Sequence, residues 1–386
     1  MTTPSSPRYV LFATTLATLV ASGSRFSFAA FVVPIELELG ASRAFLSAVA
    51  ALTLVSYGIC QPLAASVSMR LPPARVMIVG LALLAGGGWA AAATYDPLAL
   101  LIFLGLLPGV GFAFASVVPA TALLMPAFPT RPGTALGVVS AAIPAGQALL
   151  LPAAIVLIAA AGWRTAYVVL GGAALLVAAP PLLLLWHRRA APPEPRGRSA
   201  GGARADPLVI ALALGFAICG FTDQLIAIHL VPLAQSAGLA PLAAGGLLSA
   251  LTLVGIAGSV GSGPLADLWS ARATLVGVYL VRALALPLVP LALWTGETWP
   301  LWVFAAAFGL TYIANHAPAI RLLRARSGPA EATRRMGWLQ LVHQLGGATG
   351  VLAGGASVAL AGGYAPVLVI AAALAAAAAL VSLRAR

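Results

Sequence analysis

Twelve apolar stretches, each long enough to cross a lipid bilayer, constrain the fold of this chain more than any other feature. A membrane-spanning helix needs about 20 predominantly apolar residues. Only 8% of the 386 residues are charged, against roughly 25% in a soluble domain, so the chain carries too little charge to solvate a surface of this size. Because backbone groups in lipid must be hydrogen-bonded within the protein, we predict an all-α membrane protein.

Charges, prolines and glycines separate the apolar stretches and set the expected bounds of the spans. The predicted spans are about 9–35, 43–68, 75–95, 98–126, 133–161, 164–186, 207–233, 240–265, 273–293, 299–322, 335–360 and 363–383. The long polar segment 187–206 is rich in Arg, Pro and Gly, which predicts a disordered cytoplasmic linker. It would join an N-terminal six-helix half, 1–186, to a C-terminal six-helix half, 207–386.

The two halves repeat one pattern. Residues 22–55 return about 200 residues later as residues 220–254, with a proline and a glycine at matching places. At a spacing of 198, Arg25 falls on Asp223, so the copies carry opposite charges at one position within hydrophobic segments. We therefore predict two pseudo-symmetric halves and expect the first apolar stretch to be a retained span rather than a cleaved signal peptide.

Arginine placement predicts the orientation in the membrane. With a cytoplasmic N-terminus, 17 of the 21 basic residues, all Arg, face the cytoplasm and 2 face outside, while Arg25 and Arg282 lie within spans. This asymmetry follows the positive-inside rule and predicts cytoplasmic termini, in a bacterial inner membrane. It also accounts for the net charge of +12 through contact with anionic lipid. Nucleic acid is not needed as a partner.

One cytoplasmic segment carries a family signature. Gly263–Asp267 (GPLAD), followed by Arg272, resembles the loop motif G-x-L-A-D-x-x-x-x-R of the major facilitator superfamily. The first-half counterpart has Ala65 where the motif has Gly and Met69 where it has Asp. With the six-plus-six spans and basic linker, the resemblance covers nearly the whole chain. It implies two six-helix halves around a central cavity, lined in part by spans one, seven and ten, and transport by alternating access.

Within that superfamily, the chain is similar to bacterial relatives of monocarboxylate transporters and oxalate:formate exchangers. The similarity lies in Ser24–Phe28, Phe128–Gly137, Gly162–Arg164 and His229–Pro232. It implies a carboxylate substrate. Monocarboxylate carriers commonly place an Arg on span eight, whereas this chain has Ser259 there.

Arg25 and Asp223 are the first candidates for function. An ionisable side chain inside the bilayer costs several kcal/mol unless it is paired or hydrated. Both lie near the middle of their spans, one and seven. Arg25 would hold an anionic group by forked hydrogen bonds, and Asp223 a cationic group or a coupling proton. The alternative is a structural ion pair between the halves.

Other polar side chains inside spans are candidates for binding substrate or a coupling proton, or for hydrogen bonds between helices. Tyr312, Asn315 and His316 form the densest polar group of the second half. On span eleven, three candidates share one helical face, and spans five and seven add one each. These five are Gln340, His343, Gln344, Gln147 and His229. Tyr57 and Gln61 on span two have weaker claims.

Three more residues inside spans have structural interpretations. Arg282, on span nine, would either snorkel to the cytoplasmic surface or pair with a neighbouring helix. Cys60 and Cys219 lack metal-ligand spacing, and we interpret both as small core residues.

The pattern as a whole predicts a monomeric secondary transporter for a small organic anion or zwitterion, driven by protons or exchange. An efflux pump for hydrophobic compounds is an alternative, although residues 142–147 (AIPAGQ) depart from the G-P-x-x-G-G pattern of such antiporters. A membrane sensor or scaffold would fit if Arg25 and Asp223 were locked together. No metal cluster, nucleophile–base pair or phosphate loop is visible, so we predict no enzyme, cofactor or metal.

Overall fold

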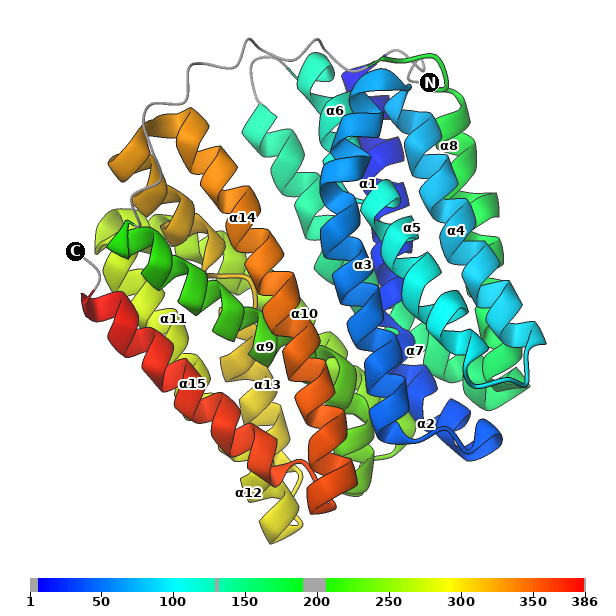
Figure 1. Cartoon of the computed structure of the whole chain (residues 1–386), viewed down its shortest axis with the longest axis vertical. Coiled ribbons are helices and arrows are strands. Elements are labelled where there is room, and N and C mark those ends of the chain that lie inside the picture. The colour runs from blue at the N-terminus through cyan, green and yellow to red at the C-terminus, as the bar shows by residue number, and fades with distance from the viewer. Residues whose placement is uncertain (1–5, 129–131, 190–205, 385–386) are drawn as a thin grey trace. The chain divides into compact units, whose positions relative to one another are not determined.

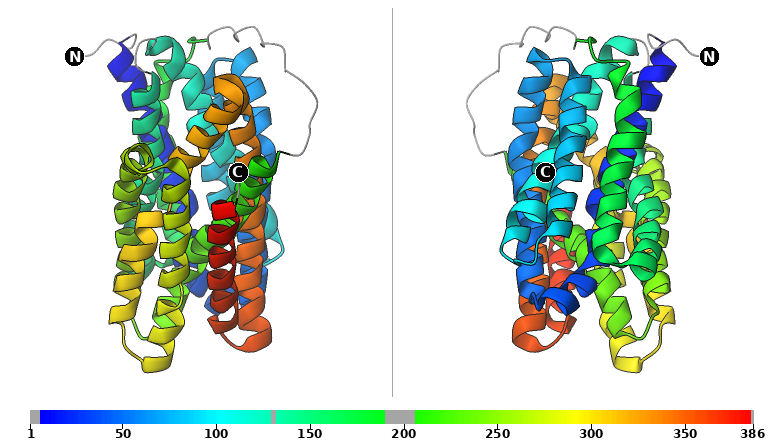
Figure 2. Two further views of the ribbon diagram at one scale, coloured as in Figure 1. Left: turned by 90° about the vertical axis from the view of Figure 1, so that its left-hand side faces the viewer. Right: turned by 90° about the vertical axis from the view of Figure 1, so that its right-hand side faces the viewer.

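Helices make up all the regular secondary structure in the part of the chain that the computed structural model describes, residues 6–128, 132–189 and 206–384. The chain divides into two compact units, Met1–Glu194 and Pro195–Arg386, and in each unit the helices run side by side (Figures 1 and 2). The predicted linker falls mainly on residues 190–205, which lie outside the described residues.

The described residues of the first unit form eight α-helices and two short π-helices. They are α1 (Pro7–Phe26), α2 (Phe28–Leu39), α3 (Arg43–Arg70), α4 (Pro73–Ala93), η1 (Leu101–Leu106), α5 (Leu107–Ala115), α6 (Val117–Ala127), α7 (Pro132–Ala173), η2 (Ala174–Ala178) and α8 (Ala179–Leu183). The second unit contains α9 (Pro207–Ser236), α10 (Pro241–Leu268), α11 (Ala271–Ala285), α12 (Leu288–Thr295), α13 (Trp299–Thr311), α14 (His316–Ala361) and α15 (Ala365–Arg384).

Eleven helical stretches of the described residues are long and apolar enough to cross a membrane, against the twelve spans predicted. The difference lies in the stretch Val138–Leu183, whose 46 residues would extend about 70 Å at 1.5 Å per residue, twice the thickness of a bilayer core. Gly162 interrupts it with φ 80° and ψ 162°, a conformation open to glycine because it has no Cβ. Predicted spans five and six therefore meet at Gly162.

Three of the spans are broken near their middle. Span one bends at Ser27, between α1 and α2, and span four has extended backbone at Ser116, between α5 and α6. Span ten is interrupted over residues 312–315, between α13 and α14. Ser116 and Ala314 are 198 residues apart (314 − 116), the same spacing as Arg25 and Asp223. The breaks of spans four and ten thus repeat between the halves and leave helix ends inside the membrane.

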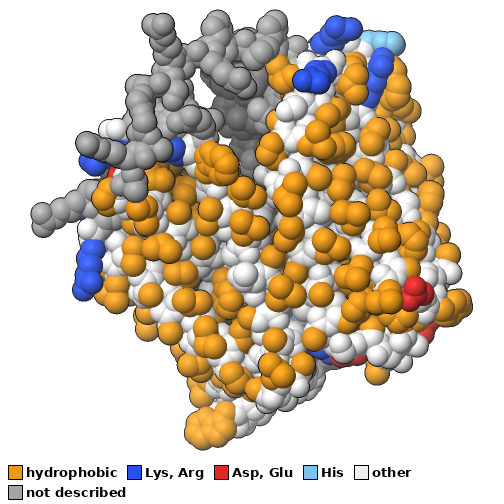
Figure 3. Space-filling view, in the orientation of Figure 1, with side chains coloured by type: hydrophobic (Ala, Val, Ile, Leu, Met, Phe, Trp, Pro, Cys, Tyr) orange, Lys and Arg blue, Asp and Glu red, His pale blue; other side chains and the backbone are white. Residues whose placement is uncertain are grey.

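The surface that faces away from the helix contacts is apolar. On the face in Figure 3, hydrophobic side chains cover most of the described surface. Leu37, Trp294 and Leu360 are 81%, 85% and 88% exposed. In water such a surface would be unfavourable, so it is the lipid-facing surface of a multi-pass integral membrane protein.

Glycines bring α9 and α14 into backbone contact. A Cβ added to Gly346 would lie 2.8 Å from the backbone carbon of Ala217, and one added to Gly350 would lie 2.8 Å from that of Phe221. Gly354, one turn further along, faces the side chains of His229 and Leu225 on α9. The four-residue spacing in span eleven therefore serves close helix packing.

Asp206 closes the N-terminus of α9, at the last residue of the predicted linker. Its Oδ1 accepts a hydrogen bond from the Leu208 amide at 3.1 Å, and its Oδ2 pairs with Arg326 Nε at 3.4 Å and Arg335 Nη1 at 3.3 Å. Partial burial acts to raise the pKa of Asp206, but the Leu208 amide and the two guanidinium groups hold it below its ordinary value.

We expect the contribution of Asp206 to stability to disappear in acid. A carboxyl whose folded-state pKa is depressed stabilises the fold above its unfolded pKa, near 4, and the stabilisation is lost as pH falls through the folded pKa. Asp206→Asn keeps an N-cap but removes the charge. The melting temperature of the wild type should exceed that of this variant at neutral pH and converge with it well below about pH 4. A constant difference at all pH values would contradict the assignment.

Candidate functional site

Asp223 and Arg282 form a buried ion pair inside the second half. Asp223 lies in the middle of α9 and Arg282 on α11, and Arg282 Nη1 is 2.8 Å from Asp223 Oδ1. The Arg282 side chain is 0% exposed and the Asp223 side chain 5% exposed. Of the two interpretations of Arg282, pairing with a neighbouring helix is therefore confirmed and snorkelling is wrong. The physical reason is that a partner of opposite charge stands on the adjacent helix.

Further hydrogen bonds from Arg282 link α11 to α9 and α13. Nη1 donates to Thr222 Oγ1 at 2.8 Å and contacts Cys219 Sγ at 3.1 Å, both on α9. Nη2 donates to the backbone carbonyl of Thr311 at 2.8 Å. Thr311 is the last residue of α13, so its carbonyl lies at the negative end of the helix dipole. This guanidinium therefore compensates the partial negative charge at the end of α13, where span ten is broken.

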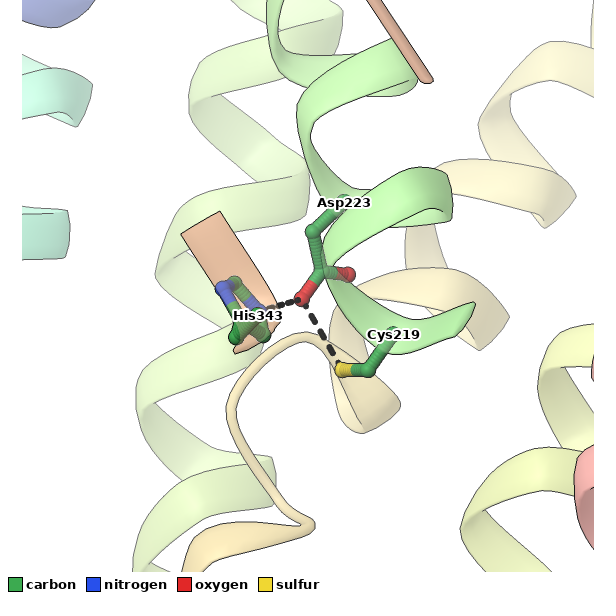
Figure 4. A group of neighbouring side chains, drawn as sticks. All are labelled: Cys219, Asp223 and His343. Carbon is green, nitrogen blue, oxygen red and sulfur yellow. Dashed lines mark hydrogen bonds and ion pairs between the residues drawn. The ribbon is translucent and has the colours of Figure 1, made fainter. Parts of the chain in front are cut away.

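Two further side chains contact the carboxylate of Asp223 (Figure 4). The Cys219 thiol donates to Oδ2 at 3.2 Å, and His343 Nε2, on α14, lies 3.4 Å from the same oxygen. The donor atoms of Cys219, Asp223 and His343 all lie within 4.8 Å of one another. Arg282 contacts both Cys219 and Asp223, so a fixed cation already stands beside this group, and we interpret it as an ion-pair cluster.

The broken segment of span ten holds a second polar group. His316 Nε2 contacts the Gln340 amide nitrogen at 2.8 Å, so Nε2 is the acceptor. Its Nδ1 must then carry the proton, and it donates to Asn315 Oδ1 at 2.9 Å and to the Ile313 carbonyl at 3.2 Å. The neutral ring is therefore fully hydrogen-bonded. Tyr312, in the same segment, is 6% exposed.

Phe216 of α9 packs beside both polar groups. Its ring centroid lies 5.4 Å from that of His316 and 6.4 Å from that of His343. Asp223, His343, His316, Asn315 and Gln340, all predicted as site residues, are thereby brought into one region of the second half.

Arg25, in the first half, is surrounded by aromatic rings. Its guanidinium carbon lies 4.4 Å from the ring centroid of Phe26, 5.4 Å from Tyr57 and 5.1 Å from Phe112. Phe112 belongs to α5, just before the break at Ser116. Arg25 is 9% exposed. Stacking uses the faces of a guanidinium, whereas its N–H donors lie at the edge, so this setting is compatible with forked hydrogen bonding to an anion.

His229 lies apart from the ion-pair cluster and serves packing. Its Nδ1 is 3.2 Å from the Tyr364 hydroxyl and its Nε2 is 3.0 Å from the Val351 carbonyl. Gly354 leaves room for the ring, since a Cβ there would lie 2.5 Å from it. Both nitrogens are engaged in a link between α9, α14 and the start of α15. This favours a role in hydrogen bonding between helices over a role in proton coupling.

Two predicted glutamines are buried without complete hydrogen bonding among the described residues. Gln147 on α7 is 1% exposed and its Nε2 lacks a partner there. Gln344 on α14 is 9% exposed and its Oε1 likewise lacks one. A binding role for each stays a prediction.

The loop motif is more helical than its sequence predicts. Gly263–Asp267 continues α10, which ends at Leu268, and Arg272 already lies in the first turn of α11. Only Trp269 and Ser270 connect the helices, and Ser270 caps α11 by accepting from the Ala273 amide at 2.9 Å.

Sequence reasoning missed three members of the cluster: Cys219, Thr222 and Thr311. Cys219 and Asp223 are four residues apart on one helix face, a signal that was available. Thr311 offers no such signal, because its carbonyl lies at a helix break that appears only in the structure.

Comparisons with known proteins identify the family that has this fold. A family model described as the Major Facilitator Superfamily matches residues 14–314 and, separately, residues 212–386. No curated protein matches the chain significantly.

Three solved structures illustrate the fold. A bacterial homolog of the human lysosomal transporter Spinster, inward-facing and unoccupied, has a TM-score of 0.77 and 19% identity, covering 100% of this chain and 99% of its own. Its occupied form has a TM-score of 0.76 at 18% identity, with 100% and 98% covered. A variant of the nucleoside transporter NupG has a TM-score of 0.76 at 11% identity, with 97% and 99% covered. The chain therefore belongs to the major facilitator superfamily and is an integral membrane transporter rather than an enzyme.

Proposed function

We propose that this secondary transporter moves a small organic anion or zwitterion by alternating access, coupled to protons or by exchange. The single observation that carries the proposal is Arg25, a buried guanidinium at mid-span whose faces lie against three aromatic rings. An ionisable side chain inside a membrane span marks a functional site by default. A carboxylate offers two oxygens at the spacing of the guanidinium fork, so it is the ligand that this geometry favours.

The second half supports a coupling role. Its cluster around Asp223 joins α9, α11, α13 and α14 through a buried network of hydrogen bonds and ion pairs. The network includes His343, and the His316 ring lies beside it. Histidine changes its charge near neutral pH, which makes it suited to carrying protons. We propose further that the protein is a monomer with cytoplasmic termini in a bacterial inner membrane, from the placement of 17 of its 21 Arg.

Thermal unfolding of detergent-purified protein tests the substrate proposal. The protein is screened against small carboxylates, amino acids and hydrophobic cations. A ligand at about 100 times its Kd adds about 2.7 kcal/mol to the free energy of unfolding and raises the melting temperature. We expect an anion or zwitterion to stabilise the wild type. Arg25→Ala should weaken that binding roughly 10- to 100-fold, since hydrogen bonds to charged groups contribute about 1.5–3 kcal/mol.

Two matched variants isolate the contribution of the guanidinium fork. Arg25→Lys keeps the charge but loses the bidentate geometry, and we expect weaker binding than in the wild type. Arg70→Ala removes an exposed Arg at the end of α3, in the same half, and should leave binding unchanged. If only bulky hydrophobic compounds stabilise the protein, and equally in Arg25→Ala, then the anion proposal fails and drug efflux becomes the better interpretation.

A further inference from the structure

Asp223 is the counter-ion of a fully buried guanidinium. Arg282 cannot be deprotonated under ordinary conditions, and it is 0% exposed, so its charge needs a compensating charge beside it. Asp223 Oδ1 stands 2.8 Å away, while Oδ2 accepts from the Cys219 thiol. Protonating Asp223 would leave the guanidinium as an uncompensated buried charge. The acidic residue that the sequence singles out thus already serves as the counter-ion of Arg282.

His343 has an available position for a proton. Its Nε2 faces Asp223 Oδ2 at 3.4 Å. A nitrogen that faces a carboxylate carries the hydrogen, so in the neutral ring Nδ1 holds the lone pair. His343 is 7% exposed, and its Nδ1 is buried with no hydrogen-bond partner among the described residues. An additional proton would enter at this nitrogen.

The other ionisable groups around His343 do not compete for that proton. Cys219 and Asp223 face it from α9, Tyr279 and Arg282 belong to α11, and the His316 ring lies 6.4 Å away at the start of α14. Both nitrogens of His316 are already engaged in its neutral form. The charged residues of α10 and α15, Asp267 and Arg384, stand at or near the C-terminal ends of those helices.

We propose that His343, and not Asp223, binds the coupling proton of this transporter, at Nδ1, while the Arg282–Asp223 pair stays ionised. This inference rests on the proton-coupled transport proposed above. The cluster is neutral when His343 is neutral, because the charges of Arg282 and Asp223 cancel, and carries +1 when His343 is protonated. The imidazolium would strengthen the contact between α14 and the carboxylate on α9, whose backbones already touch at Gly346 and Gly350. Proton binding thereby stabilises one packing of these two helices.

Proton uptake by purified, full-length protein tests the assignment without any substrate. The protein in weakly buffered detergent solution is moved from about pH 8 to about pH 5, the range in which histidine changes charge, and uptake is counted with a pH-indicator dye. His343→Gln should take up about one proton less per molecule than the wild type. The matched control, His229→Gln, replaces another buried histidine of this half, whose two ring nitrogens are already engaged, and should retain the wild-type uptake. Equal uptake by His343→Gln and the wild type, or an equal loss in both variants, would overturn the proposal.

Infrared difference spectroscopy of the wild type keeps the proposal testable if His343→Gln does not fold. With isotopically labelled Asp, protonation of Asp223 would produce the carbonyl band of an undissociated carboxylic acid in a buried setting. We expect no such band as protons are taken up, and its appearance would contradict the assignment to His343. Both measurements omit substrate. A failed ligand screen would therefore count against the proposed anion transport, whereas an unchanged proton count would count against His343 alone.

Discussion

Replacing Arg282 with Met is expected to destabilise the protein by about 3–5 kcal/mol, the cost of breaking a buried ion pair by removing one partner. Met fills a similar volume but leaves the Asp223 carboxylate, 3% exposed, without its counter-charge. It also removes the donors to Thr222 Oγ1 and to the Thr311 carbonyl. Thermal or denaturant unfolding in detergent measures the loss, with the size-exclusion profile reporting on folding.

A double-mutant cycle separates the charge from the packing. Asp223→Asn combined with Arg282→Met removes both charges, and should recover part of the stability that Arg282→Met loses. The control is Arg326→Ala, which breaks a pair in which the Arg side chain is 53% exposed and should change stability by less than about 1 kcal/mol. If Arg282→Met were as mild as Arg326→Ala, the buried pair would not be the link that joins α9, α11 and α13.

Gly350→Ala is expected to have the second largest effect, a loss of about 1–3 kcal/mol from overpacking. The added Cβ would lie 2.8 Å from the backbone carbon of Phe221. Because the obstacle is backbone rather than a flexible side chain, α9 and α14 must move apart, which would also disturb the contact between His343 and Asp223. Melting temperature measures the loss of stability, and the proton uptake described above reports on the contact.

The matched control is Gly261→Ala on α10. No atom lies within 4 Å of a Cβ built at Gly261, so the change should be neutral or slightly stabilising, because Ala favours a helix over Gly by up to about 1 kcal/mol. Equal effects of the two substitutions would show that helix propensity, and not close packing, sets the response at Gly350.

The helical membrane fold followed from the sequence because its physical cause is local. The apolar stretches were found from their length, and the predicted start of span seven matches the start of α9 at Pro207. Twelve crossings were predicted, and the non-helical Gly162 marks where spans five and six meet within one long stretch. The breaks at Ser116 and at 312–315 were not predicted, because the apolar composition continues across them.

Candidate site residues were recognised one by one, whereas their partners were not. Asp223, His316, Gln340 and His343 were selected because polar side chains in lipid need a reason to be there. Arg282 was given only a structural interpretation, yet it contacts the carboxylate of Asp223 directly. The sequence suggested Arg25 as the opposite charge for Asp223, and a contact between those two stays a prediction.

The sequence by itself determined that the chain lies in a lipid bilayer, the approximate number of its spans and the positions of polar residues within those spans. These features depend on runs of neighbouring residues, because one helix by itself can place apolar side chains in lipid and satisfy its own backbone hydrogen bonds. Only the tertiary structure decided which charges neutralise each other. Asp223, Arg282, Thr311 and His343 lie on four different helices, and glycine-mediated packing of α9 against α14 sets the distances between them. Electrostatic energy in a low-dielectric interior depends steeply on those distances, and they are not encoded in any one segment.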